Sequence, residues 1–293
     1  MARAHGIEAF CYYHYWFAGK RLIERPFNEV LASGEPDLPF CLCWANQTWT
    51  GIWHGAPNRI LIEQTYPGMD DHARHFDFLV QAFMDRRHVR VDGKPLFMVY
   101  EPTLIPDVRK VTDFWRDRAA KAGLPGLHLV GWRHATRDWD PEACGFDASS
   151  SGLPRYSYGW REPVRKIGRM IGKKLGRPML YDYADVEADL ARAAPADGEH
   201  YPCVIPNWDN TPRSGANGLV LTGATPELFR RQLRAAIERA DRLPAGRRIV
   251  FVKSWNEWAE GNHLEPDLKC GRALLDVVRD EVDRARGGAA AGR

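Results

Sequence analysis

Short apolar runs that end in aromatic and polar residues recur along the chain, and this repeated pattern restricts the possible folds more than any other feature. The runs are nearly continuous in apolar character, as expected for parallel strands that are covered on both faces. Helical patterns separate them. The strand candidates are residues 7–16, 40–49, 96–102, 127–132, 146–154, 203–210 and 249–262, and the clearest helices are 70–88, 107–122, 226–243 and 268–286. This order predicts an α/β fold.

A strand-then-helix order fits an open doubly wound sheet or a (β/α)8 TIM-type barrel. No G-x-G-x-x-G motif follows the first strand candidate, and this favours the barrel. Seven candidates are one short of eight, and the opening MARAHG resembles a helix end that stops at Gly6. We therefore expect one barrel domain over 1–286 that lacks its first strand. We also expect an insertion near 155–200, with a short helix at 186–194, and a disordered tail at 287–293.

The composition argues against nucleic-acid binding, a metal site and a membrane span. Lysine and arginine number 41 against 38 acidic residues, so the net charge of +3 does not favour nucleic acid. The six cysteines form no C-x-x-C pair, so we expect no metal and no cofactor. Several cysteines lie in apolar runs, which is typical of reduced thiols and predicts a cytoplasmic location. No leader and no run of about 18 apolar residues is evident, so we expect no membrane span.

The segment SWNEWAEGNHLEP, at 254–266, carries the strongest chemical signal because it combines carboxylates with tryptophans after the last strand candidate. Glycosidic chemistry requires one group that handles the proton of the bridging oxygen and a second that acts near the anomeric carbon. A pair of carboxylates can supply both groups. We therefore predict that Glu257 and Glu260 are catalytic, and that the one that acts as the acid has the higher pKa, in the more apolar or carboxylate-crowded setting.

Aromatic and amide side chains at the other strand ends are candidates for sugar binding, since indole rings cover sugar faces and amides bond hydroxyls. Because side chains alternate along a strand, two or three of residues 12–16 should line the barrel mouth. We expect Trp44, Tyr13, Asn46 and Trp208 to line one cleft with the two glutamates. The full set of candidates is Tyr12, Tyr13, His14, Tyr15, Trp16, Trp44, Asn46, Gln47, Tyr100, Trp132, Asn207, Trp208, Trp255, Asn256, Trp258 and His263.

Three long segments resemble the WbsX-type proteins of bacterial polysaccharide clusters, which are similar to glycoside hydrolase family 99. The segments are CYYHYWFAGKRLIERPFNEVLASGEPDLPFCLCWANQTWT, VDGKPLFMVYEP and SWNEWAEGNHLEPD. The resemblance implies a (β/α)8 barrel and a retaining mechanism. In that mechanism Glu257 takes the proton of the sugar 2-hydroxyl, whose oxygen attacks the anomeric carbon, and Glu260 is first acid and then base. Where such chains often read W-A-N-E-N-W, this one has Gln47 and Thr48.

The leading hypothesis is a glycosidase or transglycosylase that acts on an α-linked bacterial oligosaccharide or polysaccharide. The first alternative is a glycosyltransferase that uses a sugar nucleotide in O-antigen or capsule synthesis. It would require a diphosphate site, and no D-x-D motif stands at a strand end. The second alternative is an inactive carbohydrate-binding relic, in which both glutamates are dispensable. An incomplete barrel also exposes strand edges, which favour self-association.

Overall fold

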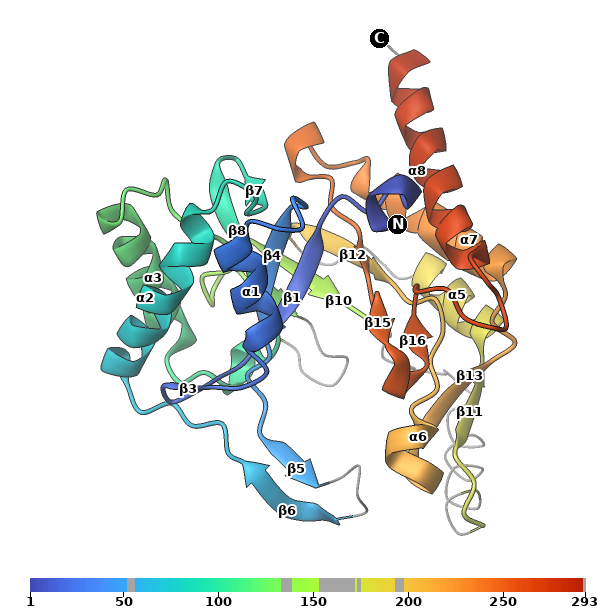
Figure 1. Cartoon of the computed structure of the whole chain (residues 1–293), viewed down its shortest axis with the longest axis horizontal. Helices are drawn as coiled ribbons and strands as arrows, with labels where there is room; N and C mark the ends of the chain where they lie inside the picture. Colours follow the sequence, from blue (N-terminus) through green and yellow to red (C-terminus); the bar gives the residue numbers. More distant parts are fainter. Residues whose placement is uncertain (52–55, 133–138, 153–171, 173–174, 193–197, 292–293) are drawn as a thin grey trace.

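Seven parallel strands form the central sheet of the computed structural model, which describes residues 1–51, 56–132, 139–152, 172, 175–192 and 198–291 (Figure 1). Neighbours pair in the order β1-β4-β8-β9-β10-β12-β14, so the strands follow one another in space as they do along the chain. Their bounds are β1 Phe10–His14, β4 Phe40–Trp44, β8 Lys94–Val99, β9 His128–Trp132, β10 Ala148–Ser151, β12 His200–Val204 and β14 Phe251–Val252. All seven expected strands are present.

Helices cover both flanks of this sheet. In Figure 1, α1, α2 and α3 lie on one flank, and α5, α7 and α8 lie on the other. A short 3-10 turn, η1 (Ala2–His5), ends at Gly6, whose φ of 83° suits glycine, as the opening sequence predicted. The helix bounds are α1 Arg25–Ser33, α2 Met69–Met84, α3 Val108–Lys121, α5 Tyr183–Arg192, α7 Pro226–Ala240 and α8 Ala273–Ala291.

Alternation along the strands separates two cores. On β4, Phe40, Leu42 and Trp44 face the helices α1 to α3, whereas Cys41 and Cys43 face the interior of the curled sheet. The interior layer continues through side chains of β8, β9 and β12, which pack against one another. The same parity governs β1, because Tyr13 pairs in register with Cys43 and His14 pairs with Trp44. Odd-numbered side chains of β1 therefore face inward.

The sheet curls as a half-barrel and does not close. β1 and β14 are its two edges, and no pairing joins them within the described residues. The expected α/β fold with seven parallel strands is therefore confirmed, but the described strands form a curled half-barrel sheet and not a closed barrel. About half of the expected insertion near 155–200 lies outside the described residues, which there are 172, 175–192 and 198–200 and include β11 (Met179–Asp182), α5 and the start of β12.

Several elements were not expected from the sequence. α1 was not predicted, nor were two small pairs of strands, β5 (Trp49–Gly51) with β6 (Ala56–Ile62) and β11 with β13 (Leu219–Thr222). β5 and β6 form an arm that projects from the body (Figure 1). α8 extends to Ala291, so the predicted disorder from 287 is wrong up to that residue. Its terminal alanines 289–291 are strong helix formers.

Short elements complete the described chain. They include the pairs β2 (Trp16–Phe17) with β3 (Lys20–Arg21) and β15 (Asn256–Glu257) with β16 (Asn262–His263). β7 (Arg90–Val91) adds to β8 in the antiparallel direction. The single turns are η3 Pro102–Leu104, α6 Thr211–Ser214, η5 Gly215–Asn217, η6 Ala245–Arg247 and η7 Trp258–Glu260. Across the described residues, no helix has the length and apolar character to cross a membrane.

Candidate active site

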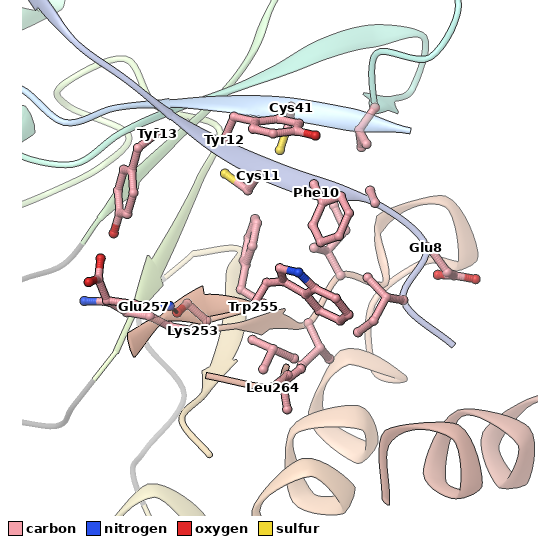
Figure 2. Close-up of a pocket in the computed structure, with 18 of the residues that line it drawn as sticks. Glu8, Phe10, Cys11, Tyr12, Tyr13, Cys41, Lys253, Trp255, Glu257 and Leu264 are labelled. Carbon is pink, nitrogen blue, oxygen red and sulfur yellow. Dashed lines mark hydrogen bonds between the residues drawn. The ribbon is translucent and has the colours of Figure 1, made fainter. Parts of the chain in front are cut away.

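A cavity of about 1370 Å³ lies between the edge strands β1 and β14. One end is polar, and Figure 2 shows Tyr13 of β1 and Glu257 on facing walls there. The other end is apolar, with Phe10 and Trp255 in edge contact at 5.5 Å between ring centroids. The polar end coincides with the carboxyl ends of the strands, where parallel barrels place their chemistry. It is lined by Tyr13, Tyr15, Gln47, Tyr100, Arg213, Lys253, Glu257 and Glu260.

A tight hairpin that follows β14 presents Glu257 and Glu260. β15 and β16 pair in antiparallel fashion, and η7 is the turn between them. The Ser254 hydroxyl joins the two sides, because it donates to the Asn262 carbonyl at 2.6 Å and accepts from the Glu257 N–H at 3.0 Å. Gly261 closes the turn with a φ of 57°. A Cβ there would lie 3.0 Å from the backbone nitrogen of Asp209, which donates to the Glu260 carbonyl at 2.7 Å.

Arg213, on α6, bridges the two glutamates. Its guanidinium donates to Glu257 Oε1 at 2.6 Å and to Glu260 Oε1 at 3.3 Å. The Glu260 side chain is 17% exposed and that of Glu257 is 29% exposed, so the pair is only partly shielded from water. Burial is the main cause that raises the pKa of Glu260, and the charge of Glu257 adds to it. Lys253 and Arg213 oppose this rise without cancelling it.

Aromatic side chains form the wall opposite the glutamates. Tyr13 contacts Tyr100 edge-on at 6.1 Å and Tyr15 at 6.4 Å, and Tyr15 packs on Trp49 at 5.0 Å between ring centroids. Burial raises the pKa of Tyr15 to about 12 and raises those of Tyr13 and Tyr100 as well. The three phenols are therefore neutral hydrogen-bond donors at ordinary pH. Behind Tyr100, the Trp132 ring stacks on it at 5.7 Å.

Amide side chains connect the ends of β4 and β8. Asn46 is fully buried, and it donates to the Glu101 carbonyl while its own amide oxygen accepts from the Glu101 N–H, both at 2.8 Å. Asn46 also donates to the Tyr66 hydroxyl at 2.9 Å. Gln47 reaches the cavity and donates to Glu101 Oε1 at 2.8 Å. Asn46 thus holds the strand ends together, and Gln47 is the amide that a ligand can meet.

The sequence-predicted residues divide between the cavity wall and other places. The candidates that line the cavity are Tyr12, Tyr13, Tyr15, Gln47, Tyr100, Trp255, Asn256, Glu257 and Glu260. Trp44 and Asn46 were expected beside Tyr13 in one cleft, and this placement is wrong because Trp44 is 1% exposed and Asn46 is fully buried. Strand parity explains Trp44, whose side chain packs under α2 and α3 against Trp115. His14 and Trp16 are buried on the same outer side and stack on His75 of α2.

Other candidates lie near the site without lining the cavity. Trp132 is buried behind Tyr100, so its predicted contact with sugar is wrong. Trp208 was expected in the cleft, but it does not line the cavity and packs against the buried cluster that includes Tyr181 of β11 and Leu221 of β13. Its neighbour Asn207 has a buried amide oxygen with no hydrogen-bond partner among the described residues. Trp258 is 48% exposed and stacks on His263 at 3.8 Å, outside the cavity.

Two cations at the site were missed by sequence reasoning. Lys253 directly follows the apolar run IVFV, and a lysine at the end of an apolar strand could have identified it as a site residue. Arg213 lies in a loop-like TPR sequence, where nothing local indicates that it reaches two glutamates 44 and 47 residues away. All six cysteines are free thiols. Within the part of the chain that the structure describes, no group of three acidic, histidine or cysteine side chains has the arrangement to hold a metal ion.

Two sequence comparisons show the family of this chain and a relative of greater length. The family model described as glycosyltransferase WbsX matches residues 1–278. The protein WxcX of Xanthomonas campestris pv. campestris, described as uncharacterized, is 36% identical over 287 residues, in each of two strains. The match covers 97% of this chain and 40% of WxcX, so the chain spans well under half the length of these relatives.

Solved structures share the fold at low identity. A glycoside hydrolase-like protein superimposes with a TM-score of 0.60 at 15% identity, over 96% of this chain and 83% of the other. The GH99 endo-alpha-mannosidase of Bacteroides thetaiotaomicron superimposes with a TM-score of 0.57 at 15% identity, over 99% of this chain and 78% of the other. At this identity the likeness establishes the fold alone.

Proposed function

Because the chain belongs to the WbsX glycosyltransferase family, we propose that it is a carbohydrate-active enzyme that acts on a bacterial polysaccharide. The reaction that we infer is cleavage or transfer of an α-glycosidic bond with retention of configuration. The observation that carries this proposal is the pair of glutamates on one tight hairpin, bridged by Arg213 and facing a tyrosine-lined cavity. Two carboxylates beside stacking rings suit glycosidic chemistry.

The two glutamates take different roles in this proposal. Glu257, held by the guanidinium of Arg213 at 2.6 Å, removes the proton of the sugar 2-hydroxyl. The freed oxygen attacks the anomeric carbon, and the bond to the leaving oxygen breaks as Glu260 gives its proton to that oxygen. Burial raises the pKa of Glu260, which favours the protonated form that an acid needs. Glu260 then removes a proton from water or a sugar hydroxyl, this oxygen opens the three-membered ring, and Glu257 returns the first proton.

The choice between water and a sugar hydroxyl separates hydrolysis from transfer. Both acceptors fit the same glutamate pair, because Glu260 acts as base toward either. The family description favours a third reaction, transfer from a sugar nucleotide, which would need a site for a diphosphate. Arg213 and Lys253 are the described cations at the polar end of the cavity, and Arg213 already contacts both carboxylates. We therefore place the glycosidase-type reaction first.

The decisive experiment compares three incubations of the pure chain. Polysaccharide alone, polysaccharide with a neutral acceptor sugar, and polysaccharide with sugar nucleotides are each assayed for new reducing ends and for changes in chain length. Polysaccharide alone should yield reducing ends, and proton NMR should detect the α-anomer first. Glu257→Gln and Glu260→Gln should lose this activity, whereas Glu227→Gln, at an exposed position of α7, should keep it. A requirement for sugar nucleotide would reject the glycosidase-type reaction.

A further inference from the structure

Lys253 projects into the polar end of the cavity, and the residues that the structure describes offer it no ion-pair partner. It follows β14, and its backbone N–H is fixed to the Val204 carbonyl at 2.9 Å. Its ammonium lies 4.8 Å from the ring centre of Trp208 and 6.0 Å from that of Tyr100, so two aromatic faces support the cation. Among the described residues, no carboxylate oxygen lies within 4.0 Å of it. A supported cation with one open side is arranged to meet an anion.

The charges that line the cavity isolate this cation further. At the apolar end, Glu8 pairs with Arg286 at 2.7 Å, and Asp241 pairs with Arg248 at 3.3 Å. Among the described residues, the polar end is lined by four charged side chains, those of Arg213, Lys253, Glu257 and Glu260. When Glu260 holds its proton as the general acid, Arg213 balances Glu257 and the charge of Lys253 is left over. The working state of the site thus carries one net positive charge.

We propose that Lys253 binds a carboxylate on the substrate, so that the enzyme selects an acidic sugar, a uronic acid, next to the scissile bond. This inference rests on the proposed function, because it assigns the substrate class of the same site. Arg213 is not the selecting residue, since its guanidinium is already engaged by Glu257 and Glu260. A single ammonium between aromatic rings matches one carboxylate on a ring that stacks on the tyrosine wall.

The competing role for Lys253 is electrostatic. Its charge opposes the rise in the pKa of Glu260, and it likewise opposes the rise that burial causes in the pKa of the Cys43 and Cys203 thiols. In that role Lys253 would be a positioning residue that adjusts the acid for every substrate alike. The two roles predict different results for a neutral sugar. Binding of a substrate carboxylate affects charged ligands only, whereas a change in the pKa of Glu260 affects charged and neutral substrates alike.

Binding to matched ligands distinguishes the two roles without any need for turnover. The probes are the methyl α-D-uronides of glucose, galactose and mannose, each compared with its neutral methyl hexoside by calorimetry. Methyl α-D-glucoside 6-phosphate tests whether any anion suffices. We expect at least one uronide to bind tenfold or more tightly than its hexoside, with a preference that falls as salt increases. Lys253→Met should abolish the preference for the uronide and leave hexoside binding within twofold. Lys110→Met, at an exposed position of α3, should change neither the preference nor hexoside binding.

Each outcome bears on the assignment. Equal binding of uronides and hexosides, binding of neither, or a preference that survives in a folded Lys253→Met chain would overturn it. Tighter binding of the phosphate than of every uronide would also overturn it, in favour of a phosphorylated sugar. If Lys253→Met keeps the preference and shifts the pH profile on all substrates, Lys253 is a positioning residue. Uronide preference in a chain without glycosidic activity would reject the proposed function and leave the acidic-sugar site standing.

Discussion

Arg213 brings the two glutamates of the E-x-x-E segment together in one candidate site. The E-x-x-E spacing by itself fits a salt-bridged surface turn as well as a catalytic pair. Here one guanidinium from a different loop holds both carboxylates toward the cavity. Because an arginine fork has a fixed geometry, the arrangement also restricts the positions of the two side chains relative to each other. The proposed glycosidic reaction therefore depends on the packing of α6, which carries Arg213, against the η7 turn, which carries Glu260.

At the residue scale, the different roles that we propose for the two glutamates predict unequal losses of activity. Glu260→Gln should lower kcat on natural substrates by about 10²-fold to 10⁴-fold, because a poor leaving group needs protonation. The same variant should lose far less activity on activated aryl glycosides, which depart without a proton. Glu257→Gln should disable both reactions, since the attacking oxygen forms in each. Steady-state kinetics on both substrates measure this, and equal losses for Glu260→Gln would reject Glu260 as the acid.

At the scale of elements, the β15–β16 hairpin depends on its glycine. Gly261→Ala combines a positive φ with a Cβ 3.0 Å from the backbone of Asp209, so the turn must shift. We expect a loss of about 1–3 kcal/mol in unfolding free energy and a tenfold or larger loss of kcat. Gly271→Ala is the matched control, because its φ of 55° is similar but nothing lies within 4 Å. Urea unfolding and kinetics should separate the two variants, and equal effects would contradict the close approach.

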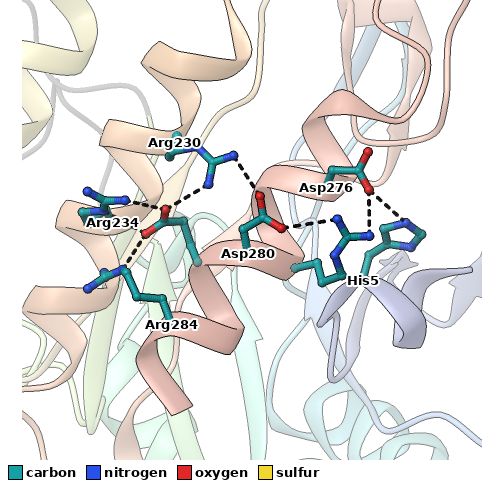
Figure 3. Close-up of polar contacts among 8 residues, drawn as sticks. His5, Arg230, Arg234, Asp276, Asp280 and Arg284 are labelled. Atoms are coloured by element: carbon teal, nitrogen blue, oxygen red, sulfur yellow. Dashed lines mark hydrogen bonds and ion pairs between the residues drawn. The ribbon is translucent and has the colours of Figure 1, made fainter. Parts of the chain in front are cut away.

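The contact between α7 and α8 rests on a buried carboxylate. Figure 3 shows the ion-pair network there, in which Arg230, Arg234 and Arg284 surround Glu281. The Glu281 side chain is 1% exposed, and hydrogen bonds from these arginines lower its pKa to about 2. Glu281→Gln would leave the guanidiniums without their counter-charge, which should cost about 2 kcal/mol of unfolding free energy.

The control for this network is Asp283→Asn, on an exposed position of the same helix. It should change the urea midpoint only slightly, because surface charge changes are usually within about 0.5 kcal/mol. Both variants retain the length and shape of the native side chain, so a difference between them reports the buried charge. Similar midpoints for the two variants would show that the network contributes no more than surface charge.

At the scale of the whole molecule, buried neutral histidines make the fold sensitive to acid. Burial lowers the pKa of His14 to about 3 and that of His88 to about 4, and it lowers those of His72, His75 and His128. Unfolded histidine has a pKa near 6.5, so the unfolded state takes up protons first as pH falls below that value. The unfolding free energy is therefore highest above about pH 6.5 and decreases below it, by about 1.4 kcal/mol per pH unit for His14 and for His88 until the folded-state pKa of each is reached.

The expected measurement is a set of urea midpoints at pH 7.5 and pH 5.0. His14 and His88 alone should lower the unfolding free energy by about 2 kcal/mol each over this interval. His14→Phe should reduce the pH dependence, because a phenyl ring can keep the stack on Phe78, now at 5.2 Å, without titrating. A stability that does not change between the two pH values would contradict the assignment of neutral buried imidazoles.

The open edges of the curled sheet are the second whole-molecule feature. β1 pairs only with β4, and β14 pairs only with β12, within the described residues. Unpaired parallel edges beside an apolar cavity favour association, so the mass measured by sedimentation should rise with concentration. Phe10→Lys would place a charge at this edge and should suppress association. Ile60→Lys on the exposed β6 arm should not, and the reverse result would locate the contact on the arm.

The sequence alone determined which segments become the seven strands of the central sheet, because seven apolar runs bounded by helical patterns have few alternatives as a parallel sheet. It also determined that carboxylates and aromatic rings follow the strands. Only the tertiary structure decided which of those rings face the cavity. Strand parity assigns Tyr13 and Tyr15 inward and sends Trp44 to the helices, and parity depends on register, which local composition does not encode. Arg213 and Lys253 likewise acquire their roles from contacts across the sheet, where residues distant in sequence meet only after the chain has folded.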